Sequence, residues 1–402
     1  MYLSHLALND FRSYEHAVIE FDKGVTTFIG SNGNGKTNIV EAIGYLSTLS
    51  SHRVSTDTAL VRQGTQAAVV QARLMHKDHP TTLEVEIYAG RANRARINRS
   101  QTKPSQLLGI VKSVVFAPED LSLVRDEPAV RRRFLDDLMI QQRPRMAKVK
   151  ADYDKVLKQR GALLKTLSSK RWRGMAIDEG ALEVWNIQLA ELGGQIMAER
   201  ARIISTLRPA IAHYYEKVAG GDKTARIDYK VSADKDMWTM PSAYDIYNSQ
   251  TAASDIESHE EELSDPSNNT KCLMHALERQ QAKEIERGAN LVGPHRDDLV
   301  LSLATFPTKG YASHGETWSF VLALRLAGWK ILKEDDEQPI LILDDVFAEL
   351  DATRRDRLAE IAGDIEQVFI TAAVDEDVPM RLGGRHYRVA PGVVQSGVVN
   401  NG

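Results

Sequence analysis

A glycine-rich segment near the amino end has the residue types and spacing of a phosphate-binding loop. Residues 30–37 read GSNGNGKT and match the pattern G-x-x-x-x-G-K-[S/T] at every position. Glycines let the backbone curl around a phosphate, and the start of a helix adds a positive dipole and N–H donors. We expect Lys36 to neutralise the β- and γ-phosphates of a nucleotide and the Thr37 hydroxyl to ligate Mg²⁺. The nucleotide-binding residues predicted here are Gly30, Ser31, Asn32, Gly33, Asn34, Gly35, Lys36 and Thr37.

Two adjacent acids far downstream have the pattern of the other half of such a site. The apolar run 339–343 ends in Asp344 and Asp345, as expected for a strand buried on both faces with carboxylates at its carboxyl end. Asp344 is the expected Mg²⁺ partner, and Asp345 would orient or deprotonate the attacking water. We therefore predict Lys36, Asp344 and Asp345 as catalytic residues, with Thr37 and Asp344 as the metal ligands.

About 300 residues separate the two halves of this site, so the chain must leave the nucleotide-binding sheet and return to it. This spacing predicts a P-loop head that is split by an inserted domain. We expect an α/β head of the ATP-binding-cassette type with a mainly helical arm domain. The expected boundaries are residues 1–140 for the first part of the head, 141–288 for the arm and 289–402 for the second part.

Strands and one helix are expected around the glycine-rich loop. Apolar residues up to Ile29 read as a strand before the loop, and a helix is expected over 36–49. Alternating apolar positions in 67–75 and 82–89 predict antiparallel strands, and 111–116 predicts another short strand. Further strands are expected over 225–232 and 299–303, and a long helix over 318–332.

The inserted region has a helical period. Apolar residues follow a 3-4 spacing from Met146 to Leu167, interrupted only by Arg160, and the spacing resumes from Leu182 to Ile196. We expect an antiparallel helical hairpin with its tip within 171–180. Whether it projects as an arm or packs on a globular core stays open, because three heptads are too few to decide. The polar, serine-rich stretch 234–270 reads as a loop or a partly disordered insertion, followed by a charged helix over 271–287.

The composition sets limits on the class of protein. The chain has 402 residues, 43% of them hydrophobic, a net charge of −4 and one cysteine, Cys272. A single cysteine excludes an internal disulfide, and neither a secretory signal nor a membrane-spanning apolar run is present, so we expect a cytoplasmic location. Because the net charge is negative, binding of a nucleic acid requires a local basic surface.

Several motifs in order give the chain a family resemblance. The quoted segments are NDFRSY (9–14), the phosphate loop, FAPEDL (116–121), RRRFLD (131–136), GPHRDD (293–298) and LDDVFAELD (343–351). Together they resemble the RecF family of recombination mediators, which belongs to the same ATPase class as the structural-maintenance-of-chromosomes proteins. The resemblance covers almost the whole chain except residues 249–270 and the carboxyl-terminal tail.

The resemblance implies further site residues. It assigns ASHGE (312–316) to the cassette signature motif, so Ser313 and Gly315 would bind the ATP of a second copy, and it adds Arg12 to the nucleotide-binding residues. A Ser-x-Gly turn before a long helix offers a hydroxyl and N–H groups to a phosphate, although an ordinary helix cap has the same pattern. Asp351 resembles the residue that crosses the same dimer interface.

The function implied by the resemblance is an ATP-dependent DNA-binding protein of replication and recombinational repair. Mg²⁺ and ATP would close a homodimer on double-stranded, gapped or junction DNA, and hydrolysis would release it. RecR and RecO would be partners in recombinase loading and the SOS response, with no membrane involved. Asp345 replaces the glutamate of transporter cassettes and no histidine occurs within 368–374, where Thr371 stands, so we expect a weak, DNA-stimulated ATPase. The alternatives are a long-coil chromosome-organising ATPase, a transporter subunit and a DNA-binding protein with a vestigial ATP site.

Three basic clusters are candidate DNA contacts. The arginines of the hairpin at 91–99, followed by Lys103, suit phosphates, but charged strand edges also protect against aggregation, so both interpretations stay open. For Arg131–Arg133 we favour pairing with Asp136 or Asp137. The predicted hairpin tip combines charge with an aromatic side chain at 170–173, as in a nucleic-acid clamp. The single histidine of GPHRDD lacks the ligand spacing of a metal site, so we reject that interpretation.

Overall fold

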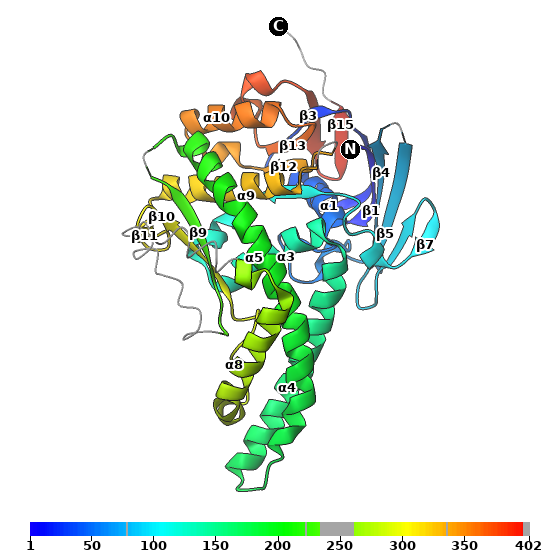
Figure 1. Ribbon diagram of the computed structural model, residues 1–402. Helices are drawn as coiled ribbons and strands as arrows, with labels where there is room; N and C mark the ends of the chain where they lie inside the picture. Colours follow the sequence, from blue (N-terminus) through cyan, green and yellow to red (C-terminus); the bar gives the residue numbers. More distant parts are fainter. Residues whose placement is uncertain (78, 222, 234–260, 335–336, 397–402) are drawn as a thin grey trace. The chain divides into compact units, whose positions relative to one another are not determined.

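The computed structural model describes residues 1–77, 79–221, 223–233, 261–334 and 337–396 (Figure 1). The chain divides into two units, and each is assembled from separated segments. The first unit comprises Met1–Leu121, His213–Asp222 and Ser313–Gly402, and the second comprises Ser122–Ala212 and Lys223–Ala312. The first unit is a two-sheet α/β head, and the second is mainly helical. This agrees with the fold class predicted from the sequence, an α/β head with an inserted helical domain.

A six-stranded sheet in the order β15-β14-β3-β13-β12-β8 forms the centre of the first unit. Its strands are β3 (Gly24–Ile29), β8 (Ser113–Phe116), β12 (Ile340–Asp344), β13 (Gln367–Ala372), β14 (Arg385–Ala390) and β15 (Val393–Ser396). All neighbours are parallel except the β14–β15 hairpin. Every residue of β12 and β13 is buried, as expected for parallel strands covered on both faces. The carboxyl ends of β3, β13 and β12 therefore meet at one edge.

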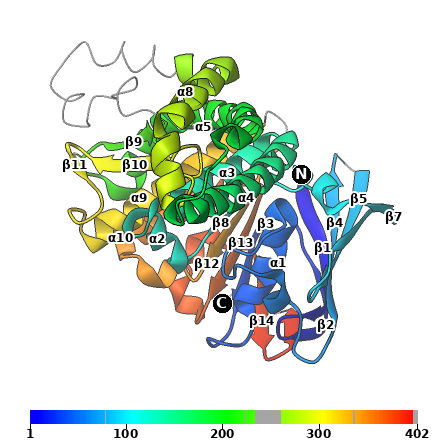
Figure 2. The same cartoon turned by 90° about the horizontal axis from the view of Figure 1, so that it is seen from below.

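A second sheet in the first unit is antiparallel and has the order β2-β1-β4-β5-β6-β7. Its strands are β1 (Tyr2–Phe11), β2 (Tyr14–Glu20), β4 (Ala67–His76), β5 (His79–Tyr88), β6 (Arg94–Ile97) and β7 (Ser100–Thr102). Helix α1 (Lys36–Thr48) lies between the two sheets (Figure 2). One hydrophobic core joins Leu6 and Val70 of this sheet with Ile39 and Ile43 of α1 and Phe28 of β3.

Two helices lie on the other face of the parallel sheet (Figures 1 and 2). They are α9 (His314–Leu332) and α10 (Ala352–Gly363). Trp318 of α9 packs edge-on against Phe116 of β8, with ring centroids 5.6 Å apart. The short 3-10 turns of the chain are η1 (Asp57–Leu60), η2 (Pro104–Gln106), η3 (Pro118–Leu121), η4 (Glu179–Leu182), η5 (Phe347–Glu349), η6 (Asp375–Asp377) and η7 (Met380–Leu382).

The second unit contains long helices and a small sheet. Its elements are α2 (Ser122–Arg125), α3 (Pro128–Gln142), α4 (Arg145–Trp172), α5 (Glu183–Ala219), α8 (Pro266–Arg287), β9 (Ala225–Lys230), β10 (Asp298–Leu303) and β11 (Phe306–Pro307). Helices α4 and α5 are the two expected helices on either side of the predicted tip. The last turns of α5, from His213, belong to the first unit.

The one charged position in the predicted apolar seam, Arg160, is fully buried in an ion pair. Its guanidinium donates to Glu284 of α8 over 2.6 Å, and neither side chain is exposed. Asn186 and Asn290 accept further hydrogen bonds from it. A third helix therefore packs on α4, and an arginine is tolerated because it is paired and hydrogen-bonded.

The observed boundaries differ from the sequence-based ones in three places. Residues 122–140 and 289–312, expected in the head, belong to the second unit, because α3 packs on β10 and α4 within it. Residues 213–222, expected in the arm, belong to the first unit. The prediction of a loop over 234–270 is wrong at its carboxyl end, because Pro266–Thr270 form the start of α8 and Asp265 caps this helix. The remainder of that expectation falls mostly on 234–260, which lie outside the described residues.

Within the part of the chain that the structure describes, no helix has the length and apolar character needed to cross a bilayer.

Candidate nucleotide-binding site

The loop between β3 and α1 has the backbone of a phosphate cradle. Gly33 and Gly35 adopt φ values of 88° and 101°, a region that side chains disfavour. A Cβ on Gly30 would lie 2.3 Å from the Val389 carbonyl oxygen, so the chain packs too closely for any side chain there. Helix α1 starts at Lys36 without a side-chain cap and without an acid in its first turn. Its first N–H groups are thus left to bind an anion.

Lys36 is buried and lacks an acidic partner. Its Nζ donates to the Gly30 carbonyl over 2.7 Å and to Asn32 Oδ1 over 3.2 Å, both uncharged acceptors. The residue is 3% exposed, and no carboxylate lies within ion-pair distance of it among the described residues. A buried ammonium without a counter-charge is costly unless an anion binds beside it. The lysine is therefore suited to neutralise a phosphate in the loop.

Thr37 and Asp344 meet at the carboxyl edge of the parallel sheet, although 307 positions separate them. The Thr37 hydroxyl donates to Asp344 Oδ1 over 3.0 Å. A hydroxyl and a carboxylate are the oxygen donors that Mg²⁺ prefers, so Thr37 and Asp344 would hold the ion at this edge. Burial raises the pKa of Asp344 to about 6, and the charge of Asp345 adds to the shift. The carboxylate is ionised at neutral pH and gains from a bound cation.

Thr371 fixes the turn after β12. Its hydroxyl donates to Asp344 Oδ1 over 2.6 Å and accepts the Asp345 backbone N–H over 2.8 Å. Asp345 has a φ of 52°, which is uncommon for a residue with a side chain. Thr371 therefore links the two predicted catalytic acids. Its position in the sequence indicates only that it stands in place of a histidine, because its contacts depend on the pairing of β12 with β13.

Arg12 supports the loop from the side. Its guanidinium forks onto the buried Glu41 of α1, with distances of 2.8 and 2.6 Å, and its Nη1 donates to the Ala59 carbonyl over 2.9 Å. Tyr14 of the same motif donates its hydroxyl to the Gly35 carbonyl over 3.1 Å. The contacts of Arg12 with Glu41 hold α1, the helix that starts at the loop, in place. A direct role of Arg12 in nucleotide binding stays a prediction.

Ser313 and Gly315 begin α9. The Ser313 Oγ accepts the Glu316 N–H over 3.3 Å, and Glu316 Oε2 accepts the Ser313 N–H over 2.8 Å, which is a capping box. Arg354 packs over Gly315 and pairs with Asp351, the other residue assigned to the dimer interface. The hydrogen bonds of Ser313 in the described chain stay within its own helix and do not reach residues 30–37. The cap is present, and binding to a second copy stays a prediction.

The predicted basic clusters are partly engaged by other groups. In the hairpin, Arg96 pairs with Glu84 and Glu86, and Arg91 stacks on Tyr88 at 3.7 Å. In RRRFLD, Arg133 approaches Asp137 at 3.9 Å as predicted, whereas Arg131 pairs with Asp298 of GPHRDD. Trp172, at the end of α4, is 87% exposed. Their roles as DNA contacts stay predictions.

The parallel sheet, the phosphate loop and the acid pair at the sheet edge define a P-loop nucleotide-binding head. The family model described as "RecF/RecN/SMC N terminal domain" matches residues 2–389. The chain belongs to the RecF family of DNA replication and repair proteins.

Curated relatives are similar over nearly their whole length. The DNA replication and repair protein RecF of Beutenbergia cavernae is 50% identical, over 98% of this chain and 99% of that protein. The protein of the same name from Streptomyces avermitilis is 47% identical, over 98% and 100%. Among solved structures, the recombination mediator protein RecF with ATPrS, described as part of the RecFOR pathway, has a TM-score of 0.84 at 24% identity, over 99% of this chain and 98% of that one. An Smc head bound to the C-winged helix domain of ScpA has a TM-score of 0.53 at 16% identity, covering 100% and 98%.

Proposed function

We propose that the protein binds Mg-ATP at residues 30–37 and uses it to control its association with DNA. The observation that carries this proposal is the 3.0 Å contact between Thr37 and Asp344, which joins the two halves of the motif beside a buried lysine without an acidic partner. Two solved relatives by fold are described with ATP or ATPrS, which supports the choice of nucleotide.

Each residue of the site has a defined task in this proposal. The loop N–H groups and Lys36 hold the phosphates, and Thr37 and Asp344 hold Mg²⁺, which supplies charge neutralisation on the phosphate oxygens. Asp345, fixed by Thr371, orients or deprotonates the attacking water. We keep Arg12 as a nucleotide-binding residue that acts through Glu41 and α1.

A second copy of the chain completes the site in this proposal. Ser313 and Gly315 would close over the phosphates of the partner, so ATP acts as a switch for homodimerisation. Hydrolysis should be slow and DNA-stimulated, because the site has an aspartate at position 345 and a threonine at 371. A turnover near 100 per second would contradict a slow switch, since enzymes commonly reach about 1 to 10³ per second.

The names of the relatives support a place in DNA replication and recombinational repair. We infer that the ATP-bound dimer holds gapped or junction DNA in the cytoplasm, with RecR and RecO as partners in recombinase loading and the SOS response. We propose a functional division into a head from residues 1–140 and 289–402 and an inserted arm over 141–288; these bounds differ from those of the compact units.

The variant Lys36→Ala tests the switch. We expect it to lose ATP binding, measured by nucleotide titration. We also expect it to lose ATP-dependent self-association and ATP-dependent retention on duplex DNA, both measured by sizing with ATP, with ADP and without nucleotide. Lys330→Ala is a matched control, because this exposed lysine lies in the last turn of α9. If Lys36→Ala self-associates and retains DNA as the wild type does, the mechanism is wrong. If the wild type binds no ATP, the site is vestigial.

A further inference from the structure

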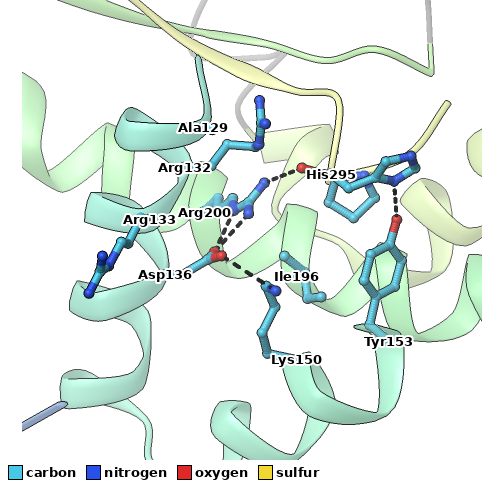
Figure 3. A pocket seen from close by; sticks show the side chains of 10 residues that line it. Ala129, Arg132, Arg133, Asp136, Lys150, Tyr153, Ile196, Arg200 and His295 are labelled. Carbon is cyan, nitrogen blue, oxygen red and sulfur yellow. Dashed lines mark hydrogen bonds and ion pairs between the residues drawn. The ribbon is translucent and has the colours of Figure 1, made fainter. Parts of the chain in front are cut away.

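A cavity in the second unit brings together two motifs that the nucleotide site does not use. RRRFLD on α3 and GPHRDD before β10 both line it, together with residues of α4 and α5, and its volume is about 340 Å³. This volume is at the lower end of the range of about 300–1,000 Å³ for small-molecule sites. Figure 3 shows Arg200, Asp136 and Lys150 converging, with Tyr153 and His295 to one side. All of the lining residues belong to this one unit.

The walls of the cavity are fixed by buried ion pairs. Arg200 is 1% exposed, and its Nε and Nη2 donate to Asp136 Oδ1 over 2.9 and 2.7 Å. Its Nη1 donates to the Pro294 carbonyl over 2.7 Å, so one guanidinium ties α5 to both motifs. Arg131 adds a forked pair with Asp298, at 2.8 and 3.1 Å. Because these contacts hold the backbone in place, the cavity is preorganised for a ligand.

The cavity has an excess of positive charge. Four cationic side chains line it, and Asp136 is the one carboxylate among the lining residues. Asp136 is already engaged by Arg200, and Lys150 lies 4.0 Å from it while pairing with Asp154 at 2.5 Å. Arg133 approaches Asp137 at 3.9 Å, so Arg132 is the one lining cation without a carboxylate at ion-pair distance among the described residues.

Arg132 has no acidic partner at this cavity. Its Nη1 donates to the Asp297 backbone carbonyl over 2.7 Å, and no carboxylate of the described chain lies within ion-pair distance of it. Burial lowers the pKa of Arg132, and the charge of Arg200 lowers it further. A guanidinium has five N–H donors in a planar fork that matches phosphate oxygens, and most of those of Arg132 are unused.

The remaining wall is uncharged and aromatic. The Tyr153 hydroxyl and His295 Nδ1 are 2.7 Å apart, and burial lowers the pKa of His295 to about 3. The imidazole is therefore neutral at physiological pH and does not add to the positive charge. Such a wall suits the organic part of a phosphate compound, while the cations suit its phosphate.

We propose that this cavity binds a phosphate group, with Arg132 as its principal ligand and Lys150 as a second cation. The group comes either from the backbone of a nucleic acid or from a free phosphate compound. Phosphate binding at this cavity does not depend on the nucleotide site. Only the assignment of the phosphate to a nucleic acid rests on the proposed function.

The test uses the full chain in a Lys36→Ala background without Mg²⁺, so that the phosphate loop does not contribute. Pyrophosphate binding is measured by calorimetry, and binding of a fluorescent 20-base-pair duplex is measured at several salt concentrations. Each is repeated after Arg132→Gln, Lys150→Gln and Arg145→Gln. Arg145 is the matched control, because it is an exposed arginine of the same unit that does not line the cavity.

We expect one pyrophosphate per chain and an affinity that falls about tenfold or more with Arg132→Gln, because hydrogen bonds to charged groups are the strong ones. Lys150→Gln should lower the affinity less, and Arg145→Gln should leave it unchanged. If the ligand is a DNA phosphate, Arg132→Gln also weakens duplex binding and reduces the salt slope by about 1. If only pyrophosphate binding depends on Arg132, the ligand is a free phosphate compound.

The proposal is overturned if Arg132→Gln and Lys150→Gln leave both pyrophosphate binding and duplex binding unchanged while their melting temperatures equal that of the parent protein. Arg132→Lys separates charge from geometry, since lysine keeps the charge but not the fork, and partial recovery is expected. Failure of wild-type chain to bind duplex would count against the proposed function and leave the pyrophosphate result valid.

Discussion

The Thr371 hydroxyl donates a 2.6 Å hydrogen bond to the Asp344 carboxylate and thereby helps to keep this buried acid ionised. That bond lowers the pKa of Asp344, against the burial that raises it to about 6. In Thr371→Val we expect the pKa to rise further, so Mg²⁺-dependent ATP binding at pH 6.5 should weaken by up to about tenfold. The measurement is ATP affinity against pH with Mg²⁺. Thr371→Ser keeps the hydroxyl and should behave as the wild type; equal profiles for valine and serine would contradict this role.

Asp344 should also make stability depend on pH. Because its folded-state pKa is raised above the ordinary value of 3.8, the folded state binds the proton more tightly and loses stability as the pH rises from about 4 to 6. Asp344→Asn removes this cost. We expect the nucleotide-free variant to be more stable by about 2 to 3 kcal/mol at pH 7.5 and to show no gain near pH 4. Urea denaturation at both pH values measures the difference, and a gain of equal size at pH 4 would exclude ionisation as its cause.

Ser313 allows the helix cap to be separated from a role in self-association. Aspartate caps a helix about as well as serine, so Ser313→Asp should leave α9 intact. Its negative charge would repel a partner's phosphates, and ATP-dependent self-association should be lost while ATP binding to the protomer's own loop is retained. Analytical ultracentrifugation with and without ATP measures the first, and nucleotide titration measures the second. Ser313→Asn caps without a charge and is the control. Normal association of Ser313→Asp would show that Ser313 is only a cap.

The buried pair of Arg160 and Glu284 should respond strongly to loss of one partner. Either Arg160→Met or Glu284→Leu leaves an unpaired buried charge, which costs about 3 to 5 kcal/mol. The double variant removes both charges and should recover most of that loss. Chemical denaturation followed by helical circular dichroism provides the double-mutant cycle. Additive losses in the double variant would mean that the two charges do not stabilise each other.

Local sequence patterns predicted the parts of the fold in which neighbours along the chain determine the structure. The phosphate loop, α1 from Lys36 to Thr48, the buried strand ending in Asp344 and the two long helices follow directly from spacing and apolar period. The β4–β5 pair over Ala67–Tyr88 also follows, because alternation specifies antiparallel strands.

Contacts between distant segments were not predictable in the same way. No pattern around Arg160 specifies Glu284, which lies 124 positions away, as its partner. Nothing local indicates that Thr371 bonds both acids, because this requires the parallel pairing of β12 with β13. The cavity beside Arg132 likewise arises from two motifs that lie more than 150 positions apart. The sequence shows which side chains can form such contacts, but which of them pair depends on the topology of the fold.

The assembly of the first unit from three chain segments sets the order in which the protein can mature during synthesis. On the ribosome, β3 and β8 emerge early, yet the strands that pair with them, β12, β13 and β14, lie more than 200 positions later, between Ile340 and Ala390. The second unit ends at Ala312, so all of its segments are made before β12, β13 and β14. Until those later strands are made, β3 and β8 lack the neighbours that they have in the folded head, and unpaired apolar strands of this kind are prone to aggregation.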